Sequence, residues 1–258
     1  MNTKELIWKF QEKIVEVYNK EFIVPLRGNN DDYQINGREI LIWYSEITRK
    51  NATKYNLHSN YHDIQNDLFI CSDEIIYFTA HLFLYKPFIN NPLNDVHIFY
   101  EKEVFPNYQN LEAKRYNMFA DIVSQKTYNY WDRIGDLIAS FFPEKLKIKQ
   151  IYFSKAIEII PEEFHSSPNF IWLNNFKNTE YNDLNKMRRQ IVHYATTDTD
   201  YNRRHLFNSS NREAMTILQV QREALPEYYK NQIKLTLEGF EKTMLLIEEF
   251  NSILFTSE

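Results

Sequence analysis

Glycine is scarce in this sequence: four residues (Gly28, Gly37, Gly135 and Gly239) among 258, where the usual share is about 7%. Nucleotide-binding α/β folds, β-sandwiches and barrels use glycine in tight turns, bulges and phosphate-binding loops. None of the four lies in a G-x-G or G-x-x-x-x-G-K pattern, so a Rossmann fingerprint and a P-loop are excluded. The scarcity favours helices joined by polar loops, and we predict an all-α fold with almost no strand.

Cysteine and long apolar runs are also missing. Cys71 is the single cysteine, which excludes intrachain disulfides and cysteine-based zinc sites. No stretch approaches about 18 uninterrupted apolar residues, and the first residues, MNTKELIWKFQEK, lack the apolar run of a signal peptide. We therefore expect a cytoplasmic protein with no membrane partner. The net charge of −5 argues against broad non-specific nucleic-acid binding but allows a local basic groove.

Aromatic residues, by contrast, are abundant. They make up 16% of the chain, with 19 Phe and 18 Tyr. Helical cores rarely need so many, so some are expected in helix–helix seams or at an oligomer interface, where aromatic side chains are enriched.

Apolar residues at steps of three and four predict helices over most of the chain. The predicted helices span residues 3–22, 38–55, 61–85, 111–142, 179–195 and 226 to the C-terminal end. Thr3 and Thr179 are the expected N-caps, and Pro226 suits the first helical position. Residues 147–160 fit neither period, and residues 161–178 and 196–212 are predicted to be loops. The apolar face widens after Met244, which predicts a helix end that is buried on two sides or pairs with another chain.

Two patterns that suggest metal binding are incomplete. His58 and His62 lie four residues apart, and an aspartate follows His62, but no third or fourth ligand accompanies them. Residues 198–209 open like a calcium-binding loop, yet Arg203 stands where glycine is needed and Ser209 where glutamate is needed. We expect neither a metal ion nor another cofactor.

The most informative segment is residues 186–194, KMRRQIVHY. It resembles the HEPN family, whose signature R-x-x-x-x-H is matched by Arg188 and His193. Residues 130–138, YWDRIGDLI, are similar to the aromatic-x-D-x-I-(G/A) stretch of HEPN helices. The resemblance covers roughly residues 111–255, and the first hundred residues match no family. It implies an all-α HEPN-like helical bundle over residues 105–258, with residues 1–104 as an N-terminal helical extension packed into the same unit.

The resemblance also implies functions. Many HEPN proteins cleave RNA without a metal ion, often as symmetric dimers that place two motifs in one cleft, and many act in toxin–antitoxin or antiphage systems. Other members bind RNA or nucleotides without cutting, or support a partner. The implied catalytic residues are Arg188 and His193, and the implied partners are a second copy of the chain, RNA, and an antitoxin or other protein.

The residues themselves suit this chemistry. Histidine titrates near neutral pH and serves as an acid or base, and arginine offers a two-pronged donor to phosphate. A single histidine does not comfortably serve as both acid and base, which gives a dimer with two histidines a mechanistic reason. The expected substrate-binding residues are Lys186, Arg189, Tyr194, Arg203 and Arg204, in a cationic segment that contains only the acids Asp198 and Asp200.

Two departures from the family pattern favour an alternative. Arg189 follows the motif arginine where HEPN nucleases usually have Asn, Asp or His, and Tyr194 stands one residue after the histidine rather than two. On an ideal helix Arg188 and His193 lie about 140° apart, which places Arg188 at the core edge and His193 on the exposed side. The alternative function is therefore a catalytically silent helical interaction or scaffold protein.

Overall fold

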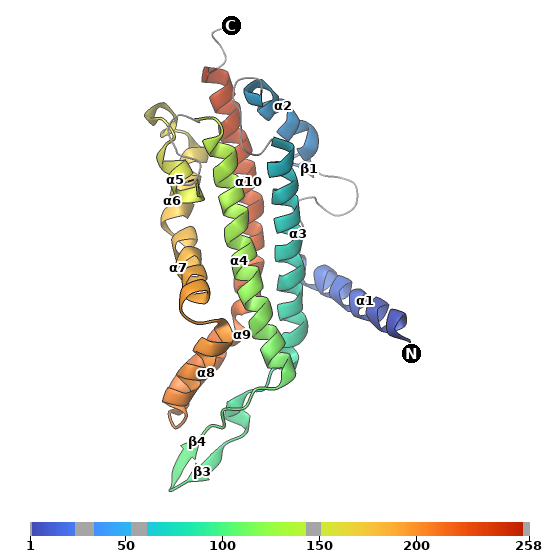
Figure 1. The fold of residues 1–258 in the computed structure, drawn as a ribbon, viewed down its shortest axis with the longest axis vertical. Helices are drawn as coiled ribbons and strands as arrows, with labels where there is room; N and C mark the ends of the chain where they lie inside the picture. The colour runs from blue at the N-terminus through green and yellow to red at the C-terminus, as the bar shows by residue number, and fades with distance from the viewer. Residues whose placement is uncertain (1, 24–33, 53–60, 143–150, 255–258) are drawn as a thin grey trace. The chain divides into compact units, whose positions relative to one another are not determined.

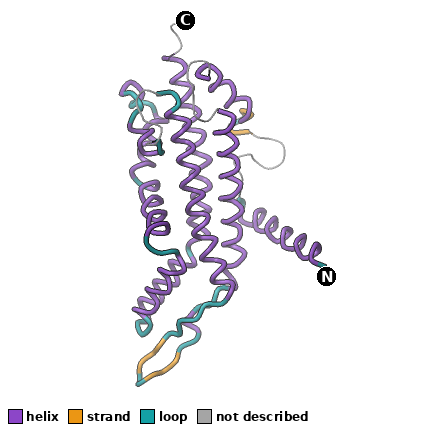
Figure 2. The backbone as a smooth tube through the Cα atoms, viewed as in Figure 1, coloured by secondary structure: helices purple, strands orange, loops and turns teal. Residues whose placement is uncertain are grey.

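The structure, a computed structural model, describes residues 2–23, 34–52, 61–142 and 151–254. Within these ranges it is almost entirely helical, which confirms the predicted all-α class (Figures 1 and 2). The helices are α1 Thr3–Glu21, α2 Ile40–Ala52, α3 Tyr61–Tyr85, α4 Leu111–Ala139, α5 Phe153–Glu158, α6 Pro168–Asn178, α7 Glu180–His193, α8 Thr197–Asn208, α9 Arg212–Glu223 and α10 Leu225–Leu254. Short 3-10 turns occupy Lys86–Phe88, Pro92–Asn94 and Glu162–Phe164.

The strands form two small antiparallel hairpins. These pair β1 (Gln34–Ile35) with β2 (Arg38–Glu39), and β3 (His97–Phe99) with β4 (Lys102–Val104). The first hairpin turns through Asn36 and Gly37, whose φ angles are 51° and 77°. A two-residue hairpin turn of this kind needs positive φ at both positions, which explains the Asn-Gly pair. This hairpin occupies the start of the segment predicted as a helix from residue 38, so α2 begins two residues later.

The long predicted helices are confirmed to within a few residues, but the predicted N-cap Thr3 is wrong. Asn2, not Thr3, caps α1: its side-chain oxygen accepts from the Glu5 amide at 2.9 Å, and the Glu5 carboxylate accepts from the Asn2 amide at 3.1 Å. This reciprocal arrangement is a capping box. Thr179 closes α6, since its hydroxyl donates to the Asn175 carbonyl at 2.8 Å. It also directly precedes α7, and its carbonyl accepts from the Asp183 amide at 3.2 Å.

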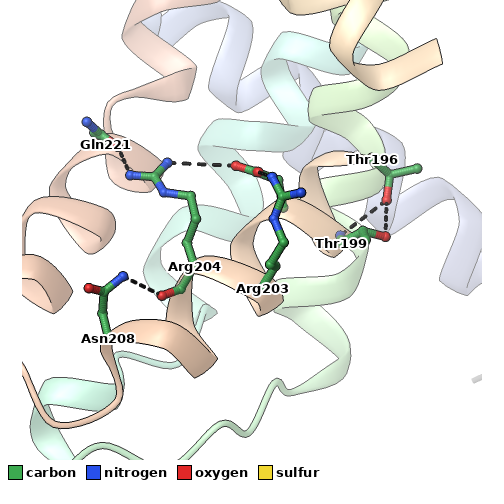
Figure 3. Close-up of polar contacts among 7 residues, drawn as sticks. Thr196, Thr199, Arg203, Arg204, Asn208 and Gln221 are labelled. Atoms are coloured by element: carbon green, nitrogen blue, oxygen red, sulfur yellow. Dashed lines mark hydrogen bonds and ion pairs between the residues drawn. The ribbon is translucent and has the colours of Figure 1, made fainter. Parts of the chain in front are cut away.

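Two segments predicted as loops are helical. Residues 161–178 contain α6, and residues 196–212 contain α8. Thr196 caps α8, since its hydroxyl oxygen accepts from the Thr199 amide at 3.2 Å (Figure 3). The polar composition of α8 conceals a narrow buried stripe of two residues four apart, Tyr201 and His205. In the ambiguous stretch 147–160, α5 begins at Phe153, and residues 147–150 lie outside the described part of the chain.

The chain divides into two compact units, each assembled from three segments. Unit 1 comprises residues 1–23, 75–125 and 186–231, and unit 2 comprises residues 24–74, 126–185 and 232–258. Both units draw on both of the regions distinguished in the sequence, 1–104 and 105–258. The cationic half of α7 and all of α8 and α9 belong to unit 1.

Aromatic side chains fill the core of unit 2. The buried Trp131 ring lies 4.0 Å from Phe176 and 5.0 Å from Phe153, measured between ring centroids. Phe250 is surrounded by three further phenylalanine rings, Phe141, Phe142 and Phe164. The widened apolar end of α10 is therefore buried on several sides within this unit, and much of the aromatic surplus lies in helix–helix seams.

One described segment meets the length and hydropathy of a membrane span. Residues 61–94 contain an 18-residue window with a mean hydropathy of 1.3, and half of this window is buried in the protein. The sequence analysis predicts no such span. A core helix meets the same criteria, so this segment is weak evidence for a membrane.

Candidate functional site

The C-terminal half of α7 carries the residues singled out in the sequence. The helix ends where the amides of Tyr194 and Ala195 both donate to the Gln190 carbonyl at 2.9 Å. Glu180 and Asp183 lie in its first turn and His193 in its last turn. Acidic residues at the start and a basic residue at the end complement the helix dipole, so the local sequence suits this helix and its boundaries.

An open hollow of about 540 Å³ lies in unit 1 beside the end of α7. It is lined by Lys186, Arg189, Gln190, Tyr194, Ala195 and Arg203. Four of the five predicted substrate-binding residues therefore meet around one concave surface, three of them cationic. Tyr194 is 80% exposed, which leaves its ring face open to a planar ligand.

Asp200 restrains two arginines of α8. Its carboxylate accepts from Arg203 at 2.7 Å and lies 3.8 Å from the Arg204 guanidinium. Arg204 also donates to the Gln221 side chain at 2.7 Å (Figure 3). Arg204, the fifth predicted substrate-binding residue, thus lines a neighbouring cavity and not the hollow. Arg189 has no ion pair or side-chain hydrogen bond within the described part of the chain, so its charge is available to a ligand.

The two motif residues are placed as the helical wheel predicts. Arg188 is half-buried and His193 is exposed. Neither lines the hollow, although their sequence neighbours Arg189 and Tyr194 do. The His193 ring lies 6.4 Å from the Tyr194 ring between centroids. A single chain therefore presents His193 near the hollow without enclosing it in a cleft.

Apolar side chains next to His193 in the sequence are exposed: Val192 by 47% and Tyr194 by 80%. Further along the chain, α8 exposes Leu206 by 61% and Phe207 by 83%.

Two residues on α4 that hold the start of α8 in place were not predicted from the sequence. The Asp121 carboxylate accepts from the Thr197 amide at 2.9 Å and from its hydroxyl at 2.6 Å. Asn117, one turn earlier, donates to Asp198 at 2.9 Å. Burial raises the pKa of Asp121 above its ordinary value, and the two bonds from Thr197 oppose this shift. The available signal was a polar pair four residues apart on the apolar face of a long helix.

Arg222 on α9 was also missed. Its side chain is buried, with 4% exposure, and lines a second cavity of about 260 Å³ in unit 1. It continues the buried stripe of Met215 and Leu218 at the next helical step. An arginine at a core position of an amphipathic helix was the signal that could have found it.

In the described residues, the structure places no further metal ligands beside His62 or beside the acids of residues 198–209. His62 lies 3.2 Å from the Asn66 amide nitrogen, and His58 is outside the described residues. In the described ranges, no three His, Cys, Asp or Glu side chains are grouped so that they could hold a metal ion. The acids of residues 198–209 lie on α8 and contact Asn117, Asn202 and the two arginines.

Comparison with known proteins identifies one family. The model of the HEPN_Cthe2314-like HEPN family matches residues 46–249. The match begins within α2 and includes α3, so it extends well beyond the stretch of roughly residues 111–255 in which the resemblance was recognised. The matched range therefore includes residues 46–104 of the predicted N-terminal extension. No curated protein matches the chain. No solved structure matches it either.

Proposed function

The chain belongs to the HEPN_Cthe2314-like HEPN family, and from this premise we propose that it binds single-stranded RNA at the end of α7 and cleaves it as a homodimer without a metal ion. The observation that carries the proposal is the hollow lined by Lys186, Arg189 and Arg203 together with the exposed ring of Tyr194. Cations that follow a backbone, next to an aromatic ring on which a base stacks, are the usual means of holding single-stranded nucleic acid.

The electrostatics of the hollow support phosphate binding. Arg189 offers a planar pair of donors that matches two phosphate oxygens. Arg203 shares its charge with Asp200, so it is held in position but partly neutralised. Arg189 is thus expected to contribute more to affinity than Arg203.

The catalytic part of the proposal rests on His193 and Arg188. An exposed imidazole can take the proton of the 2′-hydroxyl as that oxygen attacks the phosphorus, or give a proton to the leaving 5′-oxygen. His193 of one chain would accept the proton of the 2′-hydroxyl, and His193 of the second chain would give a proton to the leaving oxygen. Arg188 would stabilise the charge of the phosphorane, a contact that matters most in the transition state. The exposed Val192 and Tyr194 beside His193 support a second chain covering this surface.

We place this activity in cytoplasmic toxin–antitoxin or antiphage defence, where an antitoxin or other partner protein would control it. The support is the HEPN membership together with the exposed apolar residues of α8, Leu206 and Phe207, which a partner could cover. Co-purification of the chain with its genomic neighbour, and the toxicity of the chain expressed alone, test this placement.

The test of cleavage uses the full chain, a 5′-labelled single-stranded RNA and excess EDTA. We expect a 2′,3′-cyclic phosphate or its opened product. His193→Ala should lower the rate by about 10²–10⁴-fold, the range of general acid–base catalysis. His97→Ala is the matched control, since His97 is an exposed histidine of unit 1 on β3. Cleavage that survives His193→Ala, or that EDTA abolishes, contradicts the mechanism.

The second candidate function is a catalytically silent interaction protein. The half-buried Arg188, which lies outside the hollow, and the arginine that follows it favour this alternative. It predicts that RNA binds without being cut, or that neither occurs while a partner protein binds. Anisotropy of the same labelled RNA separates binding from cleavage.

A further inference from the structure

The second cavity of unit 1 contains a buried positive charge. Its lining residues come from α4, α7, α8, α9 and the segments beside them: Asn117, Met187, Gln190, Ile191, Ala195, Thr197, Asp200, Tyr201, Arg204, Leu218, Gln221, Arg222 and Leu225. The cavity is partly open to the surface, and its lining is mostly apolar. Its volume of about 260 Å³ is just below the roughly 300–1,000 Å³ typical of drug-sized ligand sites. It therefore has room for a small molecule.

Arg222 is the unusual member of this lining. None of its three guanidinium nitrogens has a hydrogen-bond partner in the described part of the chain, and the residue is only 4% exposed. The ring of Tyr201 lies beneath the guanidinium, 4.3 Å away at its centroid, and the Tyr201 hydroxyl also lacks a hydrogen-bond partner. The surrounding protein supplies an aromatic face to this cation, and Asp198 acts on its charge without a direct hydrogen bond to it.

The neighbouring polar groups are engaged elsewhere. Asp198 accepts from Asn117 and Asn202. Asp200 is shared between Arg203 and Arg204, and the Gln221 oxygen accepts from Arg204 (Figure 3). Burial lowers the pKa of Arg222 from its ordinary value, but a guanidinium keeps its proton in proteins. A charge of this kind is costly to bury unless an acceptor with negative charge pairs with it.

We propose that this cavity is a binding site for a small organic anion, whose carboxylate or phosphate group pairs with Arg222 and whose apolar body lies against Met187, Ile191 and Leu218. The guanidinium offers two parallel donors that match either oxyanion. The apolar lining favours a compact hydrophobic body over a polar one. The site is distinct from the hollow where we place RNA, and the inference does not depend on RNA binding.

The test measures the thermal unfolding of the full chain with two probes, benzoate and inorganic phosphate. If benzoate occupies the cavity, it should raise Tm by about 5 °C or more at one hundred times its Kd. Arg222→Met should lose this shift. The Met variant should fold without ligand, because replacing an unpaired buried charge with an apolar side chain of similar length is often neutral or stabilising.

Controls separate the cavity from general anion effects. Arg212→Met removes an exposed arginine from the same helix, α9, outside the cavity, and should keep the benzoate shift. Ile191→Phe narrows the cavity without changing its charge and should weaken benzoate binding by about tenfold or more. His193→Ala should keep the shift, so loss of RNA cleavage and loss of this site are distinguishable.

The two probes also identify the ligand chemistry. A shift with benzoate alone supports an organic carboxylate, and equal shifts with both probes support pairing through the oxyanion. Should neither probe raise Tm, or should the shift persist in Arg222→Met, the proposal is overturned. Isothermal titration of the wild-type chain gives the same decision if the Met variant does not fold.

Discussion

Arg188 and Arg189 are adjacent in sequence, yet the structure gives them different environments. Arg188 is half-buried, whereas Arg189 is exposed and lines the hollow. Adjacent residues on a helix are rotated by about 100°, which is enough to move one guanidinium from the core edge to the open surface. In this chain the residue that departs from the family pattern is therefore the one best placed to touch a phosphate.

This difference makes a prediction for RNA binding. Arg189→Ala should weaken binding and reduce the slope of log K against log salt by about 1, as expected for one lost phosphate contact. Arg188→Ala should leave affinity nearly unchanged while lowering cleavage. Anisotropy titrations at several salt concentrations measure both. Arg115→Ala is the control, because Arg115 is an exposed arginine of unit 1 that does not line the hollow. Equal effects of all three substitutions on RNA binding would contradict the role of Arg189 as a phosphate contact.

Gly135 leaves room for the close approach of α4 to α5. A Cβ atom there would lie 2.7 Å from the backbone nitrogen and 2.9 Å from the Cα of Phe153. The Phe153 amide also donates to Asp132 at 3.4 Å. The aspartate and glycine of the stretch YWDRIGDLI thus serve the close packing of α4 against the start of α5, within unit 2.

We predict that Gly135→Ala destabilises the protein by about 1–3 kcal/mol, the usual cost of overpacking. The clash is with backbone atoms, which cannot rotate away, and it should outweigh the better helix propensity of alanine. Urea unfolding measures the change. Asn129→Ala, at an exposed position of the same helix, should be nearly neutral, and a stabilising Gly135→Ala would show that the helices can separate without cost.

At the element scale, the start of α8 depends on a side chain from α4. Asp121 accepts two hydrogen bonds from Thr197, the first residue of α8. Its pKa is raised above the ordinary 3.8, mainly by burial. The folded state therefore binds this proton more tightly than the unfolded state does. The resulting contribution to stability is complete below about pH 4 and is lost as the pH rises through the raised pKa.

Asp121→Asn and Asp121→Ala should differ for this reason. The amide of Asn keeps an acceptor and does not titrate, so this variant should gain stability relative to the wild type as the pH rises from 3 to 7. Asp121→Ala leaves the start of α8 without its acceptor and should cost about 1 kcal/mol at neutral pH, as for a lost helix cap. Urea unfolding at several pH values tests both, and a difference between Asn and wild type that does not change with pH would contradict the pKa shift.

The long helices were predictable because each buries a continuous apolar stripe with clear stops. The helix α10 begins at Leu225, one residue before the predicted Pro226, and α3 has the predicted bounds. The helix α8 was not predicted because only Tyr201 and His205 are buried among its polar residues. Two buried residues in a helix of about three turns are too few to show the helical repeat of apolar residues in the sequence. Its stability comes from partners distant in sequence, such as the Phe105 carbonyl 3.0 Å from the His205 ring.

The candidate site was predictable in part for a related reason. Lys186 and Arg189 are three residues apart on α7, so their spacing alone brings them together. Tyr194 follows the last residue of α7 and joins them in the folded structure. Arg203 joins them, and Arg204 does not, only because α8 is a helix that turns adjacent residues in different directions. Arg222 carries no motif, and its significance depends on the absence of an acceptor around it, which only the folded structure shows.

At the scale of the whole molecule, the proposed chemistry requires two chains. Light scattering at tens of micromolar should give the mass of a dimer, and the interface should include the end of α7. Val192→Asp places a charge on an apolar side chain that is already 47% exposed. It should therefore weaken the dimer with little effect on the fold of the monomer. If the variant keeps the mass of a dimer, the interface does not include the end of α7.

Mixing wild-type and His193→Ala chains tests whether two histidines share one site. If every active site needs His193 from both chains, mixed dimers are inactive. Random exchange in an equal mixture then leaves about half of the activity per wild-type chain, because only like pairs remain competent. The same mixture assayed before subunits exchange should retain full activity and serves as the control. Activity that stays unchanged after exchange would mean that each chain carries a complete site, in which a single His193 performs both proton transfers.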